Sequence, residues 1–173
     1  MESRAKFLGH AIHPMLIVFP LGLLISAVLF DLFYLMTGNA SLSTVAYWNI
    51  AGGVIGGLLA TIFGLRDWLA IPEGTRAKAI GLWHGGGNVV VMGLFAIAWY
   101  LRRDDPAHLT STIPFVLEVI AIGMGATTGW LGGELVGRLA VGVDPGAHLN
   151  SPSSLSDKPA SASVDERPSV VGD

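Results

Sequence analysis

Four long apolar runs dominate this sequence and restrict the folds that it can adopt. Residues 14–36, 47–69, 79–101 and 113–135 are each long enough to cross a hydrocarbon core, which takes about 20 residues of helix. Backbone polar groups in lipid must be satisfied within the segment, and a transmembrane strand would be about half as long, with alternating polarity. The runs therefore predict four transmembrane helices.

Composition supports the same interpretation, since 51% of the residues are hydrophobic and only 13% are charged, with a mean hydropathy of +0.59. The linkers between the runs are short, so neighbouring helices are expected to be antiparallel. The predicted fold class is all-α, an integral membrane four-helix antiparallel bundle over residues 1–143. Residues 144–173 are rich in Ser, Pro and Ala and lack aromatic residues, which predicts a disordered cytoplasmic tail.

Charge and cysteine content exclude several classes of function. The net charge is −3 and no basic patch occurs, so nucleic-acid binding has no support. Cysteine is absent, which excludes disulfides, thiolate metal sites, iron–sulfur clusters and covalently attached c-type haem. Any metal or cofactor has to be held by His, Asp, Glu or Met.

The basic residues are divided unequally between the two faces of the predicted bundle. Arg102 and Arg103 lie on one face, and six lie on the face that carries the N-terminus and the second loop: Arg4, Lys6, Arg66, Arg76, Lys78 and Arg138. Positive residues favour the cytoplasmic side of a membrane. The sequence therefore predicts a multi-pass protein of the bacterial inner membrane with both termini in the cytoplasm.

Polar and ionisable side chains gather at the face that carries the N-terminus. Such groups are costly inside a membrane, which makes each of them a candidate functional residue. Alternating helix directions bring six to this level: His10, His13, Arg66, Asp67, His84 and Glu134. His10 and His13 share a face if the first helix extends back through them. Pro14 instead favours a helix start that leaves His10 in the entry segment.

His84 lies deeper, on the third helix, and is followed by three glycines and Asn88. A haem b held by two histidines uses imidazoles from different helices, and a pair of His84 with His10 or His13 has that form. The alternative cofactor is a divalent transition metal bound by nitrogen and oxygen ligands from His10, His13, His84, Asp67 and Glu134. A third interpretation is a structural hydrogen-bond network, in which Arg66 or Arg138 pairs with Asp67 or Glu134.

The opposite face carries a thinner polar set of Asp31, Asn49 and Glu118. Asp31 lies about 27 Å along the helix from His13, so it belongs to a different site. We interpret these residues as interfacial, because no continuous polar line joins the two sets.

Glycine is frequent in the second, third and fourth helices, including the run GGVIGG at residues 52–57. Small residues let membrane helices approach closely, which favours a packing role. The second interpretation is that the missing side chains make room for a flat macrocycle or a lipid tail.

Signatures of soluble enzymes are lacking. The segment GLWHGGGN has neither the spacing nor the lysine of a phosphate-binding loop, and Ser26 is a lone serine in an apolar span. The preferred function is electron transfer through haem or a metal, with the lipid bilayer and a redox or membrane-protein partner. The alternatives are a non-catalytic scaffold or interaction subunit, and a small-solute or ion transporter.

Several motifs occur in an order that resembles a known family. They are GHAIHPMLIVFPLGL, then GLLATIFGLRDWLAIP, then GLWH running to Asn88, and finally GWLGGELV with VGVD. Over about residues 8–144 they are similar to the uncharacterised prokaryotic membrane family catalogued as domain of unknown function 2231. The resemblance implies a small four-helix membrane protein of unestablished function, with His10, His13, Asp67, His84 and Glu134 on motif positions.

Overall fold

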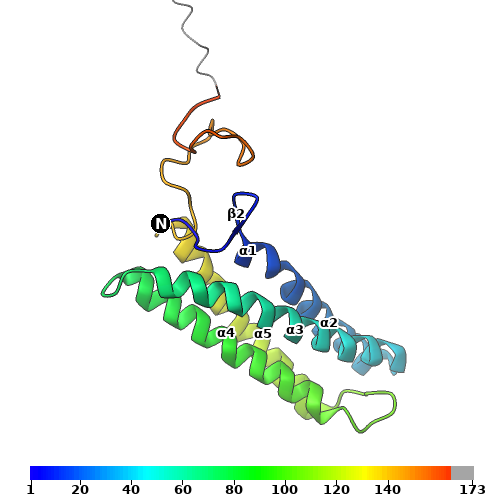
Figure 1. Cartoon of the computed structure of the whole chain (residues 1–173). Coiled ribbons are helices and arrows are strands. Elements are labelled where there is room, and N and C mark those ends of the chain that lie inside the picture. The colour runs from blue at the N-terminus through cyan, green and yellow to red at the C-terminus, as the bar shows by residue number, and fades with distance from the viewer. Residues whose placement is uncertain (165–173) are drawn as a thin grey trace, which may run out of the picture.

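The computed structural model describes residues 1–164 and consists mainly of long helices (Figure 1). A short helix leads into four long ones: α1 (Ile12–Leu16), α2 (Val18–Thr37), α3 (Ala40–Ala70), α4 (Arg76–Leu101) and α5 (Thr112–Gly137). Four units are each long and apolar enough to cross a membrane: α1 together with α2, and α3, α4 and α5 singly. The predicted all-α fold with four spans is confirmed.

The start of α3 and the continuity of the first span differ from those predicted, and in both cases the local sequence explains the difference. The second span begins at Ala40 rather than at residue 47, because the Asn39 side chain accepts a hydrogen bond from Ser41 N at 3.2 Å and so caps the first turn. The first span is interrupted at Ile17. Pro20 has no N–H to donate to the carbonyl of Leu16, which breaks the helical hydrogen-bond ladder there.

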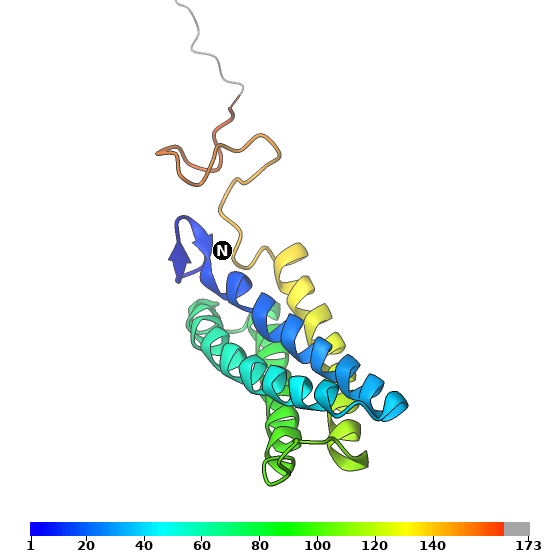
Figure 2. The same cartoon turned by 90° about the vertical axis from the view of Figure 1, so that its right-hand side faces the viewer.

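The helices pair as two antiparallel hairpins, α2 with α3 and α4 with α5, and α3 packs on α4. Figure 2 shows the two hairpins as layers whose axes are inclined to each other. Both the N-terminal segment and the chain that follows α5 lie at one end of the bundle (Figure 1). We call that end the histidine end, and the end with the α2–α3 and α4–α5 loops the arginine end.

The centre of the bundle is built from small and apolar side chains of all four long helices: Leu24, Ala27, Ala46, Ile50, Val91, Phe95 and Ala121. Glycines of α3 allow this close packing. A Cβ on Gly53 would lie 2.6 Å from Leu24 Cδ2, and one on Gly57 would lie 2.4 Å from Met92 Cε. The packing role predicted for the GGVIGG run is therefore confirmed at both positions.

The N-terminal segment folds as a small hairpin of β1 (Lys6–Phe7) and β2 (His10–Ala11), which Gly9 closes with φ of +83°. Lys6 pairs with Asp144 and with Glu2, and these hydrogen bonds raise the pKa of its ammonium group above the usual 10.5. Described tail residues 144–164 form turns and bends, and disorder stays a prediction for them. The predicted disorder of residues 165–173 lies outside the described residues.

Candidate functional site

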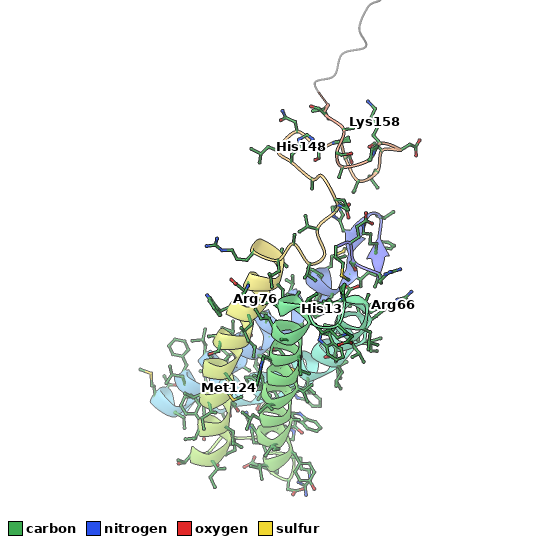
Figure 3. The ribbon with its side chains drawn as sticks, turned by 90° about the vertical axis from the view of Figure 1, so that its left-hand side faces the viewer. His13, Arg66, Arg76, Met124, His148 and Lys158 are labelled. Atoms are coloured by element: carbon green, nitrogen blue, oxygen red, sulfur yellow. The ribbon has the colours of Figure 1, made fainter. Side chains whose placement is uncertain are left out.

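The two deepest histidines at the histidine end face each other across the bundle. His13 lies in α1 and His84 in α4, with ring centroids 6.4 Å apart and ring planes at 85°. Figure 3 shows His13 inside the bundle, between the helices. Of the two first-helix histidines that the sequence left open, the structure brings His13 to His84.

Backbone carbonyls fix the orientation of both imidazoles. His13 Nδ1 lies 2.9 Å from the carbonyl oxygen of Ala60, and His84 Nδ1 lies 2.7 Å from that of Thr128. A carbonyl oxygen only accepts, so each Nδ1 carries the proton and each Nε2 keeps its lone pair. This is the tautomer in which a histidine can ligate a metal through Nε2.

Two glycines allow the rings to sit against their helices. A Cβ on Gly64 of α3 would lie 2.9 Å from His13 Nδ1, and a Cβ on Gly132 of α5 would lie 2.9 Å from His84 Cε1. The His13 ring thus fills the space that Gly64 leaves on α3, the helix whose Ala60 carbonyl it bonds. The His84 ring does the same at Gly132 on α5, the helix that carries the Thr128 carbonyl. The sequence indicated Gly132 among the glycines of the fourth helix but not Gly64, and it did not predict that either would contact a histidine ring.

The two Nε2 atoms differ in their surroundings. His84 Nε2 accepts a hydrogen bond from Asn88 Nδ2 at 3.3 Å, and the other end of this amide, Oδ1, accepts one from Thr128 Oγ1 at 2.7 Å. Within residues 1–164, no hydrogen-bond partner lies at His13 Nε2. The free lone pair of His13 and the weakly held one of His84 are therefore available to a ligand.

The remaining predicted ligands are engaged elsewhere at the same end. Ser154 of the tail hydrogen-bonds His10 Nε2 at 3.1 Å, and Asp67 accepts hydrogen bonds from Ser3 Oγ and the Arg4 backbone N–H. Arg76 pairs with Glu134 at 2.6 Å. The pairing of Asp67 or Glu134 with Arg66 or Arg138, expected in the structural network, does not form within the described chain.

No group of three or more His, Asp or Glu side chains converges on a metal position in the described chain. The set of His10, His13, His84, Asp67 and Glu134 stays a prediction, and the structure brings only His13 and His84 of it together. A bare ion between them would have two protein ligands, whereas a haem iron brings four nitrogens of its own and needs only two axial ligands. The donor set thus fits haem better than a bare ion.

A second polar cluster lies at the arginine end and joins all four long helices. Arg102, at the end of α4, bonds Asp31 of α2 through both Nη atoms at 2.7 and 3.1 Å and Glu118 of α5 at 3.2 Å. Arg102 Nη2 also donates to Ser43 Oγ of α3 at 2.9 Å, and Ser43 Oγ donates to Asp31 at 2.8 Å.

Asp31 and Glu118 are enclosed by the bundle, since both side chains are 0% exposed and Arg102 is 1% exposed, and their interfacial depth in a membrane stays a prediction. Asn49 does not belong with them and hydrogen-bonds Ser26 instead. Sequence reasoning missed Arg102, although a signal existed. Two acids inside spans at one end need a cation at that level, and Arg102 ends the third span there.

The fold and its sites define a four-span membrane protein with a buried ion cluster at one end and a histidine pair near the other. The chain belongs to the family described as predicted membrane protein (DUF2231), whose family model matches residues 9–145. The family resemblance seen in the sequence is thereby confirmed. No curated protein and no solved structure gives a match.

Proposed function

We propose that this protein binds one haem b between His13 and His84 and transfers electrons through it. The observation that supports the proposal is the geometry of the two imidazoles. Because a metal–nitrogen bond is about 2 Å long, two imidazoles that would hold one metal ion between them need ring centroids about 6 Å apart. The centroids of His13 and His84 lie 6.4 Å apart.

The residues of this chain supply orientation and basicity. The carbonyls of Ala60 and Thr128 hold the Nδ1 protons and make each Nε2 a stronger donor of its lone pair. The Asn88 amide is oriented by its Oδ1, which accepts a hydrogen bond from Thr128 Oγ1, and its Nδ2 is the donor that would give up His84 Nε2 to a haem. A haem held by these residues would supply one-electron redox chemistry.

The test is the absorption spectrum of full-length protein purified in detergent and titrated with haem. We expect a Soret band that His13→Ala and His84→Ala abolish and that His10→Ala retains, since Ser154 engages His10. His108→Ala is the matched control at the arginine end. A wild type that stays colourless would support the non-catalytic subunit, and bound metal without a Soret band would support the non-haem set.

We further propose that the protein resides in the bacterial inner membrane with both termini in the cytoplasm. Six basic residues lie at the histidine end, as the sequence indicated. At the opposite end Arg102 is buried in ion pairs, which leaves Arg103 as the one exposed arginine there in the described chain. Of the six, Lys78 is likewise buried, so five accessible basic residues at the histidine end, against Arg103 at the other end, support this orientation.

A further inference from the structure

A shallow groove of about 540 Å³ at the histidine end lies away from the histidine pair. Its lining consists of two arginines and four apolar residues: Arg4, Ile62, Leu65, Arg66, Leu69 and Ala70. Figure 3 shows Arg66 at the outer edge of the bundle, on the side opposite Arg76. The groove is therefore separate from the proposed haem site.

Hydrogen bonds to Asp67 hold the N-terminal segment so that Arg4 lies beside Arg66. Ser3 Oγ approaches both Asp67 carboxylate oxygens, at 2.9 and 2.7 Å, and the Arg4 backbone N–H donates to Oδ1 at 2.7 Å. These bonds clamp the N-terminal segment onto α3. They also engage the carboxylate next to Arg66 in the sequence, and in the described chain Asp67 forms no ion pair with Arg66 or Arg4.

The two guanidinium groups carry uncompensated positive charge. In the part of the chain that the structure describes, neither the Arg4 nor the Arg66 side chain forms an ion pair or hydrogen bond. Arg76 and Lys78 at this end are instead paired, with Glu134 and with Glu73. Arg4 and Arg66 are therefore available to bind an anion.

The wall of the groove is apolar and belongs to a membrane span. Ile62, Leu65 and Leu69 are 62%, 51% and 63% exposed, and their spacing places them on one face of α3. Helix α3 has 31 residues and is longer than a hydrocarbon core is thick, so its last turns reach the headgroup level. The groove thus has a cationic mouth near the membrane surface and an apolar wall below it.

We propose that Arg4 and Arg66 bind the headgroup phosphate of an anionic phospholipid, with an acyl chain against Ile62, Leu65 and Leu69. Arginine binds phosphate with two parallel hydrogen bonds, and two arginines suit a headgroup that carries net negative charge. An acidic peptide would match the charge but not the apolar wall. The continuity of charge and apolar surface along one helix favours the lipid.

The experiment uses full-length protein in detergent and counts retained lipids by native mass spectrometry. Phosphatidylglycerol is the probe, with phosphatidylcholine and inorganic phosphate as separate arms. We expect phosphatidylglycerol to be retained in preference to phosphatidylcholine, and Arg4→Gln combined with Arg66→Gln to weaken it roughly 30-fold, since each arginine near an anionic surface contributes about fivefold. Both arginines are exposed, so the variant should fold.

Arg138→Gln is the matched control, because Arg138 is exposed near the same end, unpaired in the described residues, and outside the groove. It should retain phosphatidylglycerol as the wild type does. Equal retention of both lipids, full retention by the double variant, or an equal loss in the control would overturn the proposal. Saturable binding of inorganic phosphate with no lipid preference would also overturn it, because the apolar wall would then play no part.

Discussion

One guanidinium group, that of Arg102, serves two buried carboxylates, and the two are not bound equally. Asp31 accepts from both Arg102 Nη atoms and from Ser43 Oγ, whereas Glu118 accepts a single bond of 3.2 Å and its Oε2 has no hydrogen-bond partner in the described chain. Asp31 is therefore the principal counter-ion. Glu118 is the weaker partner.

This asymmetry predicts unequal costs for two charge-removing substitutions. Asp31→Asn leaves the buried Arg102 guanidinium with Glu118, its more weakly bound partner, as the one carboxylate. This substitution should lower the free energy of unfolding by about 3–5 kcal/mol. Glu118→Gln keeps the Oε1 acceptor and the Arg102–Asp31 pair, so its cost should stay below about 1.5 kcal/mol. Unfolding in mixed micelles, followed by circular dichroism, measures both. Equal losses would contradict the assignment.

Among the helices, the glycines of α5 differ in what surrounds them. Gly132 faces the His84 ring, whereas Gly133, its neighbour in sequence, has nothing within 4 Å of the position where a Cβ would lie. A Gly132→Ala methyl would lie 2.9 Å from His84 Cε1 and 3.3 Å from Nδ1. The ring is anchored by the Thr128 carbonyl, so it cannot move away without lengthening that bond.

Gly132→Ala should therefore lower thermal stability, and on the proposed function it should also weaken haem binding. Gly133→Ala should leave haem binding unchanged and stabilise the helix by up to about 1 kcal/mol, the difference in helix propensity between the two residues. Thermal unfolding with and without haem separates these effects. A Gly132→Ala protein as stable as Gly133→Ala would show that His84 is not seated on α5.

The helices that span the membrane were predictable because length and apolarity alone define them. The start of α3 was not, since Ser41, Ser43 and Thr44 give residues 40–46 a polar appearance, while Ser43 turns inward to Arg102. The depth of His84 in the third predicted span marked it as a candidate site residue. The carbonyls of Ala60 and Thr128 carry no sequence signal, because their positions depend on the register between packed helices.

In the molecule as a whole, the two polar clusters lie at opposite ends of an apolar bundle. The ion cluster ties all four long helices together at the arginine end, and the histidine pair links the two hairpins toward the other end. Between them lies the small-residue core. An even number of spans puts the N-terminal segment and the chain that follows α5 on one side, in agreement with their common end in Figure 1.

The orientation of the molecule can be decided with single cysteines, because the chain has none of its own. Asp104→Cys introduces a thiol in the α4–α5 loop, where Asp104 is 82% exposed, and Ser156→Cys introduces one in the tail, where Ser156 is also exposed. With six basic residues at the histidine end, we expect that end in the cytoplasm. A membrane-impermeant maleimide added to intact spheroplasts should then label Asp104→Cys at once and Ser156→Cys only after the membrane is permeabilised. The reverse labelling pattern would place both termini and the histidine pair on the outer side, and the proposed electron transfer would then have to serve a partner there.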